Sequence, residues 1–401
     1  MRPVSALLPY EEAKRMVDRT VKPLDRAETT RLEDSFDRVL AEDIYSDLDV
    51  PGFDRAAMDG YAIVAEDVEE AKPESPVELE ILGVLDAGSE ANIKVVRGKC
   101  VQISTGARMP DGANAVVMVE DTSRSANFVS IKKAVRTWGN VGRAGEDIKK
   151  GEMVLSTEEV LTPGKVGVLA ALGLIKCNVF ARPVVSVFAT GDEVVPVGGR
   201  IAPGQVYDIN THTIACVLKE NGCSVIVEGV LRDNREEMET ALKAALTSDL
   251  IVLSGSSSAG SKDLLEDVLS SNGTVLFHGV KMKPGKPTML ATLQGKPIFV
   301  MPGYPTSCLM NSYLFLVPCV RRLARLPQKY DRALTVPLAG EVTSARERTL
   351  FLTVRIDDGR AVPVFKESGA ITSISRADGF IEVPAERGTL NKGELVQVHL
   401  F

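Results

Sequence analysis

The sequence predicts a multi-domain α/β protein built around a mostly parallel sheet between residues 179 and 328. Apolar strand-like segments alternate there with helix-like segments of about ten residues, a pattern that requires crossovers between parallel strands. The regions before and after this stretch differ, because short strands separated by glycines and charged turns dominate them. At 401 residues the chain also exceeds the size of one ordinary domain.

The central stretch divides into alternating elements. Buried strands are predicted at 183–189, 224–231, 249–253, 274–277 and 297–301. Helices are predicted at 210–220, 235–246, 262–270 and from 306 to about 326. These elements define an α/β domain at 179–328.

The N-terminal part of the chain mixes helices and strands. An amphipathic helix is predicted at 9–20, a short helix at 35–43, and another that begins after Thr162 and stops at Gly173. Between them lie short strands at 61–64, 77–84, 100–103, 115–119 and 128–131. The return to helical character predicts a discontinuous domain, 1–50 plus 143–178, with a β domain inserted at 51–142.

The C-terminal part returns to strands after a linker that begins at Pro327. The strands are predicted at 334–338, 350–356, 361–364, 380–383 and 395–400. We therefore expect a separate small β domain at 329–401, either a barrel or a sandwich.

Composition excludes several classes of function. The net charge is −7 and no basic cluster offsets it, which argues against a nucleic-acid partner. No apolar run approaches the roughly 20 residues that cross a bilayer, and the first residues lack a secretory pattern. The six cysteines and three histidines are scattered, so they predict no disulfide framework or metal site. We expect a cytoplasmic protein.

Several loops at predicted strand ends carry the chemistry that a phosphate-bearing substrate needs. The Ser/Gly-rich loop from Ser254 to Gly260 lies between a strand and a helix, where backbone N–H groups can hold a phosphate. The nearby cations Lys281, Lys283 and Lys286 strengthen this interpretation. In open α/β sheets, ligands bind at this edge of the sheet.

A group of carboxylates belongs to the same predicted layer: Asp192, Glu193, Asp208, Asp233 and Asp263. Carboxylates beside phosphates are typical of a Mg²⁺ site, but they can also pair with the edge of a pterin or purine. Each could instead cap a helix, Asp208 and Asp263 most of all. No Ser/His/Asp or Cys/His arrangement is visible, which favours metal-assisted phosphate chemistry.

Motifs along the whole chain resemble those of the molybdopterin molybdenumtransferases, the family of bacterial MoeA and the E domain of gephyrin. The matching segments are Ala57-Met58-Asp59-Gly60-Tyr61-Ala62, Thr105-Gly106-Ala107 with Met109-Pro110, Gly145-Glu146-Asp147, Thr190-Gly191-Asp192-Glu193, Gly204-Gln205-Val206-Tyr207-Asp208-Ile209-Asn210, Lys283-Pro284-Gly285-Lys286-Pro287 and Pro302-Gly303-Tyr304-Pro305. Their order along the chain makes the resemblance specific.

The resemblance implies an elongated, discontinuous N-terminal domain with an inserted β domain, a molybdopterin-binding α/β domain and a C-terminal β-barrel. It also implies a homodimer. The implied reaction takes adenylylated molybdopterin and molybdate (or tungstate), releases AMP with Mg²⁺ and inserts the metal into the dithiolene. The molybdopterin adenylyltransferase, which makes that substrate, is a candidate partner.

The resemblance also implies roles for individual residues. Asp59, Asp147 and Asp263 would be catalytic, and Asp59, Thr105 and Asp147 would face the site from the partner subunit. Glu193, Asp233 and Asp263 would hold metal or pterin. The residues expected to bind substrate are Thr105, Thr190, Asp192, Glu193, Asp233, Ser254, Gly255, Ser258, Gly260, Lys281, Lys283, Lys286, Pro302, Gly303 and Pro305.

The sequence departs from the family pattern at three places. These departures bear on which oxyanion the protein prefers, molybdate or tungstate, more than on the class of reaction. A double glycine is replaced by Gly255-Ser256, and Tyr304 stands where the family has asparagine. Gly279 aligns with a lysine of the family, and Lys281 is its candidate substitute.

Two alternatives belong to other classes. A gephyrin-like scaffold, whose partners dock rather than react, would keep the dimer but need no carboxylates such as Asp59, Asp147 and Asp263. A molybdopterin adenylyltransferase is normally a single α/β domain, which leaves residues 1–178 and 331–401 without a purpose.

Overall fold

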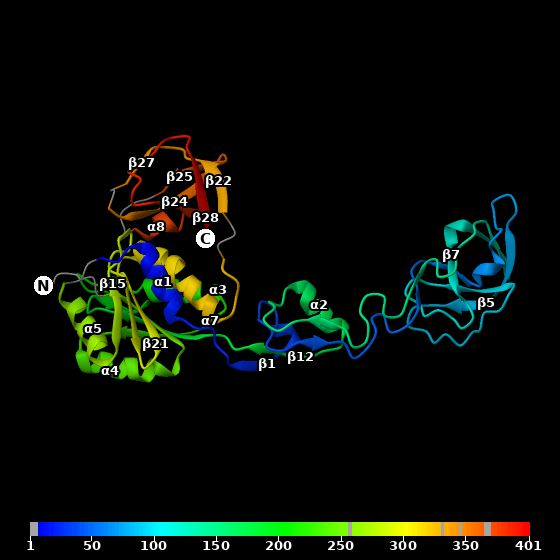
Figure 1. Cartoon of the computed structure of the whole chain (residues 1–401), viewed down its shortest axis with the longest axis horizontal. Helices are drawn as coiled ribbons and strands as arrows, with labels where there is room; N and C mark the ends of the chain where they lie inside the picture. Colours follow the sequence, from blue (N-terminus) through cyan, green and yellow to red (C-terminus); the bar gives the residue numbers. More distant parts are fainter. Residues whose placement is uncertain (1–6, 256–258, 330–332, 345–346, 365–369) are drawn as a thin grey trace. The chain divides into compact units, whose positions relative to one another are not determined.

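The computed structural model describes residues 7–255, 259–329, 333–344, 347–364 and 370–401, and of residues 259–263 it describes the backbone only. The chain packs into two compact units (Figure 1). Unit 1 consists of Met1–Glu28, Asp37–Val39 and Val179–Phe401, and unit 2 of Thr29–Phe36 and Leu40–Asn178. No helix in the described residues is long and apolar enough to cross a membrane.

Unit 1 contains the expected α/β sheet. Its strand order is β16 (Ser224–Leu231), β13 (Val184–Thr190), β17 (Leu250–Gly255), β21 (Lys296–Met301), β20 (Met289–Leu293) and β18 (Thr274–His278). The first four strands are parallel, whereas β20 pairs antiparallel with both neighbours. The predicted multi-domain α/β fold is therefore confirmed.

The sheet is buried on both faces, which explains its nearly continuous apolar strands. Along β17, Leu250 and Val252 belong to one core cluster, and Ile251 and Leu253 to another. The first cluster is covered by α1 (Tyr10–Thr20), α3 (Asn210–Glu220), η5 (Ser312–Leu316) and α7 (Val317–Leu323). The second cluster is covered by α4 (Arg235–Ala244), η4 (Ala245–Thr247) and α5 (Ala259–Asn272).

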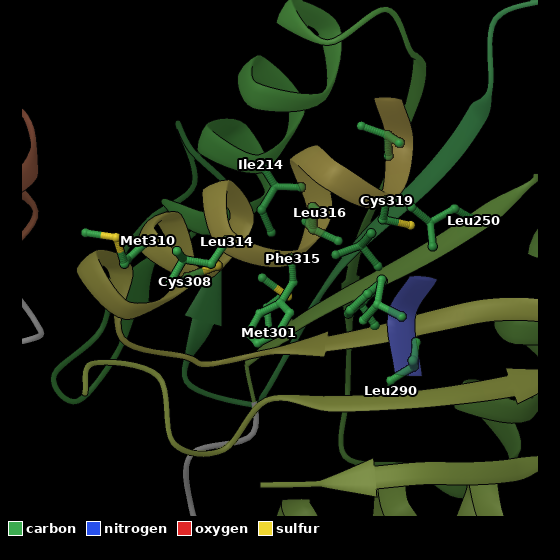
Figure 2. Packing of buried hydrophobic residues seen from close by; sticks show 14 of the residues in the cluster. Ile214, Leu250, Leu290, Met301, Cys308, Met310, Leu314, Phe315, Leu316 and Cys319 are labelled. Carbon is green, nitrogen blue, oxygen red and sulfur yellow. The ribbon is translucent and has the colours of Figure 1, made fainter. Parts of the chain in front are cut away.

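Figure 2 shows the first cluster from close by, with Phe315 and Cys319 of the long helical segment packed beside the strands that carry Leu250 and Leu290. One continuous helix was expected from 306 to about 326, and that expectation is wrong. The segment is α6 (Pro305–Asn311), the π-helical η5 and α7. Pro318 explains the interruption, because it lacks an N–H and its ring would clash with a carbonyl one α-turn earlier.

Two further differences have local causes. The helix expected at 35–43 does not form: Asp37 has φ +59° and the Leu40 N–H bonds to the Glu159 carbonyl oxygen, so the backbone is extended. Strand β20 was not expected. It forms a hairpin with β21 through Gln294 and Gly295, whose positive φ values of 50° and 79° suit a two-residue turn.

The capping of α4 gives a first prediction. The Asn234 side-chain oxygen accepts the N–H of Glu237 at 3.0 Å. Asn234→Ala removes this acceptor and is expected to lower the free energy of unfolding of unit 1 by about 1 kcal/mol, measured in urea. An equal loss in Asn234→Ser, which keeps an accepting oxygen, would contradict this role.

The end of unit 1 is a β-rich region. One sheet has the order β19 (Met282–Lys283), β24 (Thr349–Asp357), β26 (Gly379–Val383), β28 (Leu395–Leu400) and β22 (Ala333–Pro337), with β25 (Arg360–Pro363) on β24. The remaining elements are the ladder of β23 (Val342–Thr343) with β27 (Thr389–Leu390) and the short helix α8 (Ile371–Ile374). The barrel form stays a prediction.

Unit 2 is organised around a six-stranded sheet. Its order is β7 (Ala115–Met118), β4 (Gly60–Ile63), β6 (Lys99–Ile103), β5 (Val77–Leu85), β9 (Phe128–Ile131) and β8 (Thr122–Ser125). The unit also holds α2 (Pro163–Ala171), η1 (Leu32–Asp34), η2 (Ala65–Asp67), η3 (Val119–Asp121) and the ladders β3 (Arg55–Ala56) with β10 (Val141–Gly142) and β2 (Ile44–Tyr45) with β11 (Met153–Leu155).

The boundary between the units falls within the ladder of β1 (Ala27–Arg31) and β12 (Lys176–Phe180). Residues 1–28 group with unit 1, because Tyr10, Ala13 and Val17 of α1 are buried in its core. The four predicted domain ranges stay predictions.

Candidate functional site

The carboxyl ends of four parallel strands meet at one edge of the unit 1 sheet. Thr190 of β13 pairs with Leu231 of β16 and with Gly255 of β17, and Ser254 pairs with Met301 of β21. The loops that follow these strands therefore begin side by side. The structure thus brings together the candidate residues Thr190, Asp192, Glu193, Asp233, Ser254, Gly255, Pro302, Gly303 and Pro305.

The ends of β13 and β17 approach closely. Gly255 has φ +135°, and a Cβ there would lie 2.1 Å from the Thr190 carbonyl oxygen, so only glycine fits. Thr190 is buried, and its Oγ1 has no hydrogen-bond partner in the described part of the chain. Because a buried hydroxyl without a partner costs free energy, a polar ligand atom at this position would be stabilised.

Carboxylates gather beside this point. The Asp233 N–H donates to Asp192 Oδ1 at 3.5 Å, and the Arg232 guanidinium donates to the Asp192 carbonyl oxygen at 3.0 Å. Glu193 lies against Gly191, where a Cβ would be 2.5 Å from Glu193 Oε2. The loop after β13 therefore holds two carboxylates next to the carboxylate that follows β16.

Among these carboxylates, Asp233 has the least favourable environment for its charge. Its Oδ1 is buried without a hydrogen-bond partner among the described residues. Burial, and then the negative charges of Asp192 and Glu193, raise the pKa of the Asp233 carboxyl above its ordinary value. A divalent cation would relieve both conditions, because it supplies charge and accepts carboxylate oxygens as ligands. The residues present therefore fit Mg²⁺.

The predicted metal set lies partly outside the described side chains. Among described side chains, no group of three or more His, Cys, Asp or Glu residues forms a metal-binding cluster. Ser258 lies outside the described residues, and of Gly260 and Asp263 only the helical backbone is described. Asp208 behaves as expected for a helix cap, since it is buried and accepts the Thr211 N–H at 3.1 Å.

The lysine loop lies at the same edge, because β18 ends and β20 begins there. Lys281, Lys283 and Lys286 are exposed, while the Pro284-Gly285 turn between them is buried. The Lys286 carbonyl oxygen accepts the Val280 N–H at 2.9 Å, which closes the loop. The structure therefore places three cationic side chains on a fixed turn.

Asn311 of α6 fixes that turn through a hydrogen bond to its backbone. Its Nδ2 donates to the Gly285 carbonyl oxygen at 3.1 Å, and the Thr288 hydroxyl donates to the same oxygen at 2.9 Å. Gly285 has φ +103°, and a Cβ there would lie 2.2 Å from Asn311 Oδ1. Asn311 is fully buried, so this contact joins the lysine loop rigidly to α6.

The loop after β21 is held in a similar way. Asn210 of α3 donates from Nδ2 to the Gly303 carbonyl oxygen at 2.8 Å, and its buried Oδ1 has no partner within the described chain. Pro305 starts α6, and Tyr304 is 58% exposed. The sequence analysis gave neither Asn210 nor Asn311 a role in the site. Asn210 could have been suspected, because it ends a segment that matches the family and begins α3, whereas Asn311 is the last residue of α6 and has no such signal.

The remaining candidates, Asp59, Thr105 and Asp147, lie in unit 2. Asp59 accepts the Thr105 N–H at 2.7 Å and the Thr105 hydroxyl at 3.0 Å. These donors, the backbone N–H first, hold the pKa of the Asp59 carboxyl below its ordinary value. Asp147 is exposed at the end of the glycine-rich loop, and its N–H donates to the Val50 carbonyl oxygen.

These contacts predict the effect of Thr105→Val. The variant removes the hydroxyl donor but keeps the N–H donor, so the pKa of Asp59 is expected to rise while staying below its ordinary value. A carbon NMR titration of the Asp59 carboxyl measures this. Ser104→Ala is the matched control, because Ser104 donates to Asp86 instead, at 2.8 Å. An unchanged Asp59 pKa in Thr105→Val would contradict the observed hydrogen bond.

Comparison with known proteins covers nearly the whole chain. Residues 8–173 match the family model "MoeA N-terminal region (domain I and II)". Residues 186–322 match the model "Probable molybdopterin binding domain", and residues 335–401 match "MoeA C-terminal region (domain IV)".

Individual relatives agree with these matches. The chain is 32% identical over 405 residues to the molybdopterin molybdenumtransferase of Bacillus subtilis, covering 98% of this chain and 94% of that protein. It is 32% identical over 376 residues to the protein of the same name from Staphylococcus epidermidis, covering 92% and 90%. The crystal structure of a molybdopterin biosynthesis MoeA protein from Pyrococcus horikoshii superposes with a TM-score of 0.84, at 39% identity, over 98% of this chain and 99% of that one.

Proposed function

We propose, because the chain belongs to the molybdopterin molybdenumtransferase family, that it inserts molybdenum into adenylylated molybdopterin during molybdenum cofactor biosynthesis. Molybdate, or tungstate in its place, is the second substrate. Water cleaves the phosphoanhydride bond of the adenylylated substrate and AMP leaves. The dithiolene sulfurs replace two oxygens of molybdate, which leave as water with protons from the thiols and from solvent. The edge of the unit 1 sheet is the proposed substrate site.

One observation carries this proposal: a half-buried carboxylate with an unpartnered oxygen and a rigid lysine turn lie at the same sheet edge. Partial burial and two neighbouring carboxylates raise the pKa of Asp233, and Lys283 and Lys286 are exposed on a turn fixed by Asn311. A phosphoanhydride substrate needs both a cation-binding carboxylate and cationic side chains. A carboxylate that only capped a helix, or a lysine turn that only faced solvent, would require neither of these features.

Glu193 and Asp233, with Asp263, would hold Mg²⁺ in this site. Bound there, Mg²⁺ would neutralise charge on the phosphate oxygens of the substrate. The unpartnered Asp233 Oδ1 supports this assignment, because it is a buried ligand oxygen with no other partner within the described residues. Either carboxylate could also orient the pterin edge through paired hydrogen bonds.

The anionic groups would be bound by the other residues of the edge. Lys281, Lys283 and Lys286 would bind phosphate or molybdate oxygens, as charge-assisted donors. The unpartnered Thr190 Oγ1 is positioned to bind a polar atom of the substrate. The Ser254-Gly255 strand end and the loop from Pro302 to Pro305 would contact substrate through their backbone.

We further propose a homodimer in which unit 2 of a second copy completes each site. Asp59, Thr105 and Asp147 would then act on the substrate held by the first copy. The lowered pKa of Asp59 is consistent with a charged carboxylate that accepts hydrogen bonds or helps to bind a cation at the site. Asp59, Asp147 and Asp263 are the proposed catalytic residues.

The test is AMP release from adenylylated molybdopterin with Mg²⁺, with and without molybdate. Wild type is compared with Asp59→Ala and Asp263→Ala. The proposal predicts molybdate-dependent release that both substitutions abolish. Substrate binding without any release would reject it and favour a non-catalytic scaffold. AMP incorporation from ATP into molybdopterin would instead favour an adenylyltransferase.

A further inference from the structure

Trp138 of unit 2 occupies a backbone position that does not suit it. Its φ is +64°, a left-handed conformation that glycine and asparagine tolerate and bulky side chains rarely adopt. Its side chain is 40% exposed, so the strain is not offset by deep burial. Residues held in such sparsely populated backbone conformations cluster at active sites and ligand-binding sites. The backbone strain and the exposure of this indole therefore point to a contact at the protein surface rather than to a role in the core.

The loop around Trp138 is fixed rather than loose. The Trp138 N–H donates to the Asn114 carbonyl oxygen, and the Gly139 carbonyl oxygen accepts the Val116 N–H at 3.0 Å. Asn140, with φ +56°, donates from Nδ2 to the Val116 carbonyl oxygen at 2.9 Å. These bonds tie the loop to β7, so the indole is presented in a defined position.

Arg143 covers the indole. Its guanidinium carbon lies 3.6 Å from the centroid of the Trp138 ring, a cation–π contact. Nε donates to Asp54 Oδ1 at 3.1 Å, which fixes the plane of the guanidinium. In the described part of the chain this is the one side-chain hydrogen bond of Arg143, so its two terminal nitrogens can still donate.

The loop that carries this pair is hydrogen-bonded to the segment that carries the proposed catalytic carboxylate. The Ala57 N–H donates to the Asn140 carbonyl oxygen at 2.9 Å, and Asp59 follows two residues later. A second exposed cation, Arg55, pairs with Gly142 across the β3–β10 ladder. The surface therefore combines a flat aromatic group, a fixed guanidinium and a further arginine within one short stretch.

We propose that Trp138 and Arg143 form a binding site for the nucleotide half of the substrate, an inference that rests on the proposed function. The adenine ring stacks on the Trp138–Arg143 pair, and the terminal nitrogens of Arg143, with Arg55, bind the phosphate. Planar bases stack on aromatic rings and on guanidinium groups, and arginine forks bind phosphate oxygens. The position is tryptophan, rather than glycine or asparagine, because it binds a ligand.

The chain allows a direct test, because Trp138 is its single tryptophan. Tryptophan fluorescence of the full-length protein is followed during titration with AMP, adenosine and ribose 5-phosphate. AMP is expected to change the emission saturably, adenosine at higher concentration, and ribose 5-phosphate without a stacking signal. Saturable AMP binding by calorimetry with unchanged emission would overturn the proposal, as would no AMP binding at all.

Variants separate ligand binding from folding. Trp138→Asn relieves the backbone strain, so its urea midpoint is expected to equal or exceed that of wild type. Its dissociation constant for AMP is expected to rise about tenfold or more, as for loss of one stacked base. Ala126→Asn is the matched control, since Ala126 also has a positive φ of 49° but lies in the β8–β9 turn. Unchanged AMP binding in Trp138→Asn would overturn the proposal.

The same experiments distinguish this inference from the proposed function. Molybdate-dependent AMP release by wild type, with AMP binding that does not involve Trp138, would reject the nucleotide site and keep the reaction. AMP binding at Trp138 without any molybdate-dependent release would keep the site and reject the reaction.

Discussion

Gly285→Ala is expected to lower the AMP-release rate about 100-fold and the free energy of unfolding of unit 1 by about 2–4 kcal/mol. The added Cβ would lie 2.2 Å from the buried Asn311 side chain, at a φ of +103° that alanine rarely adopts. The turn must move to relieve this overlap. Lys283 and Lys286 then leave the positions in which they would bind the substrate.

Two controls separate the clash from the loss of a glycine. Gly295→Ala also places alanine at a positive φ, 79°, but nothing lies within 4 Å of its Cβ. It is expected to be only mildly destabilised and fully active. Asn311→Ala removes the clashing amide, so Gly285→Ala should cost less stability in that background than in wild type. Equal effects of Gly285→Ala in both backgrounds would show that the clash is not the cause.

Asp233→Asn is expected to lower Mg²⁺-dependent AMP release by at least about tenfold while leaving the metal-free protein as stable as wild type, or more so. The amide keeps the shape but cannot act as an anionic ligand. Burial, and then the negative charges of Asp192 and Glu193, raise the pKa of Asp233 in the folded state, so its charge destabilises the fold. Most substitutions of catalytic residues would instead reduce both the rate of AMP release and the free energy of unfolding.

The pH dependence of this stability difference has a definite sign. A raised folded-state pKa means that the contribution of Asp233 to stability is fully present at acid pH and is lost as pH rises through that pKa. The free energy of unfolding of Asp233→Asn should therefore exceed that of wild type at neutral pH, and this difference should disappear at acid pH. Asp358→Asn, at an exposed turn, is the control. A gain that is independent of pH would contradict the raised pKa.

The sequence predicted the main elements of the α/β domain because their boundaries are locally encoded. The bounds of α3 and β16 agree with expectation, since Asn221-Gly222 stops the helix and Gly222 has φ +81°. Strand β20 was missed because its apolar run is short and its only local signal is Gly295. The π-helical turn could have been suspected from Pro318, whose effect depends on its position within an otherwise regular helix.

The site was partly predictable for a similar reason. Loops at the ends of parallel strands share one edge, so the placement of Thr190, Asp233 and Gly255 follows from topology. The contacts of the supporting residues were not predictable. Asn210 and Asn311 lie on helices and reach backbone atoms 93 and 26 residues away in the chain. Such contacts depend on the tertiary packing and leave no local pattern.

The measurement that tests the central claim most directly is AMP release by mixed dimers of Asp59→Ala and Asp233→Asn copies, purified through two different tags. If unit 2 of one copy completes the unit 1 site of the other, one site in each mixed dimer is intact. The account predicts that each variant alone has at most about a tenth of the wild-type rate and that the mixed dimer recovers about half of the wild-type, molybdate-dependent rate. Mixed dimers no more active than the parent variants would contradict it.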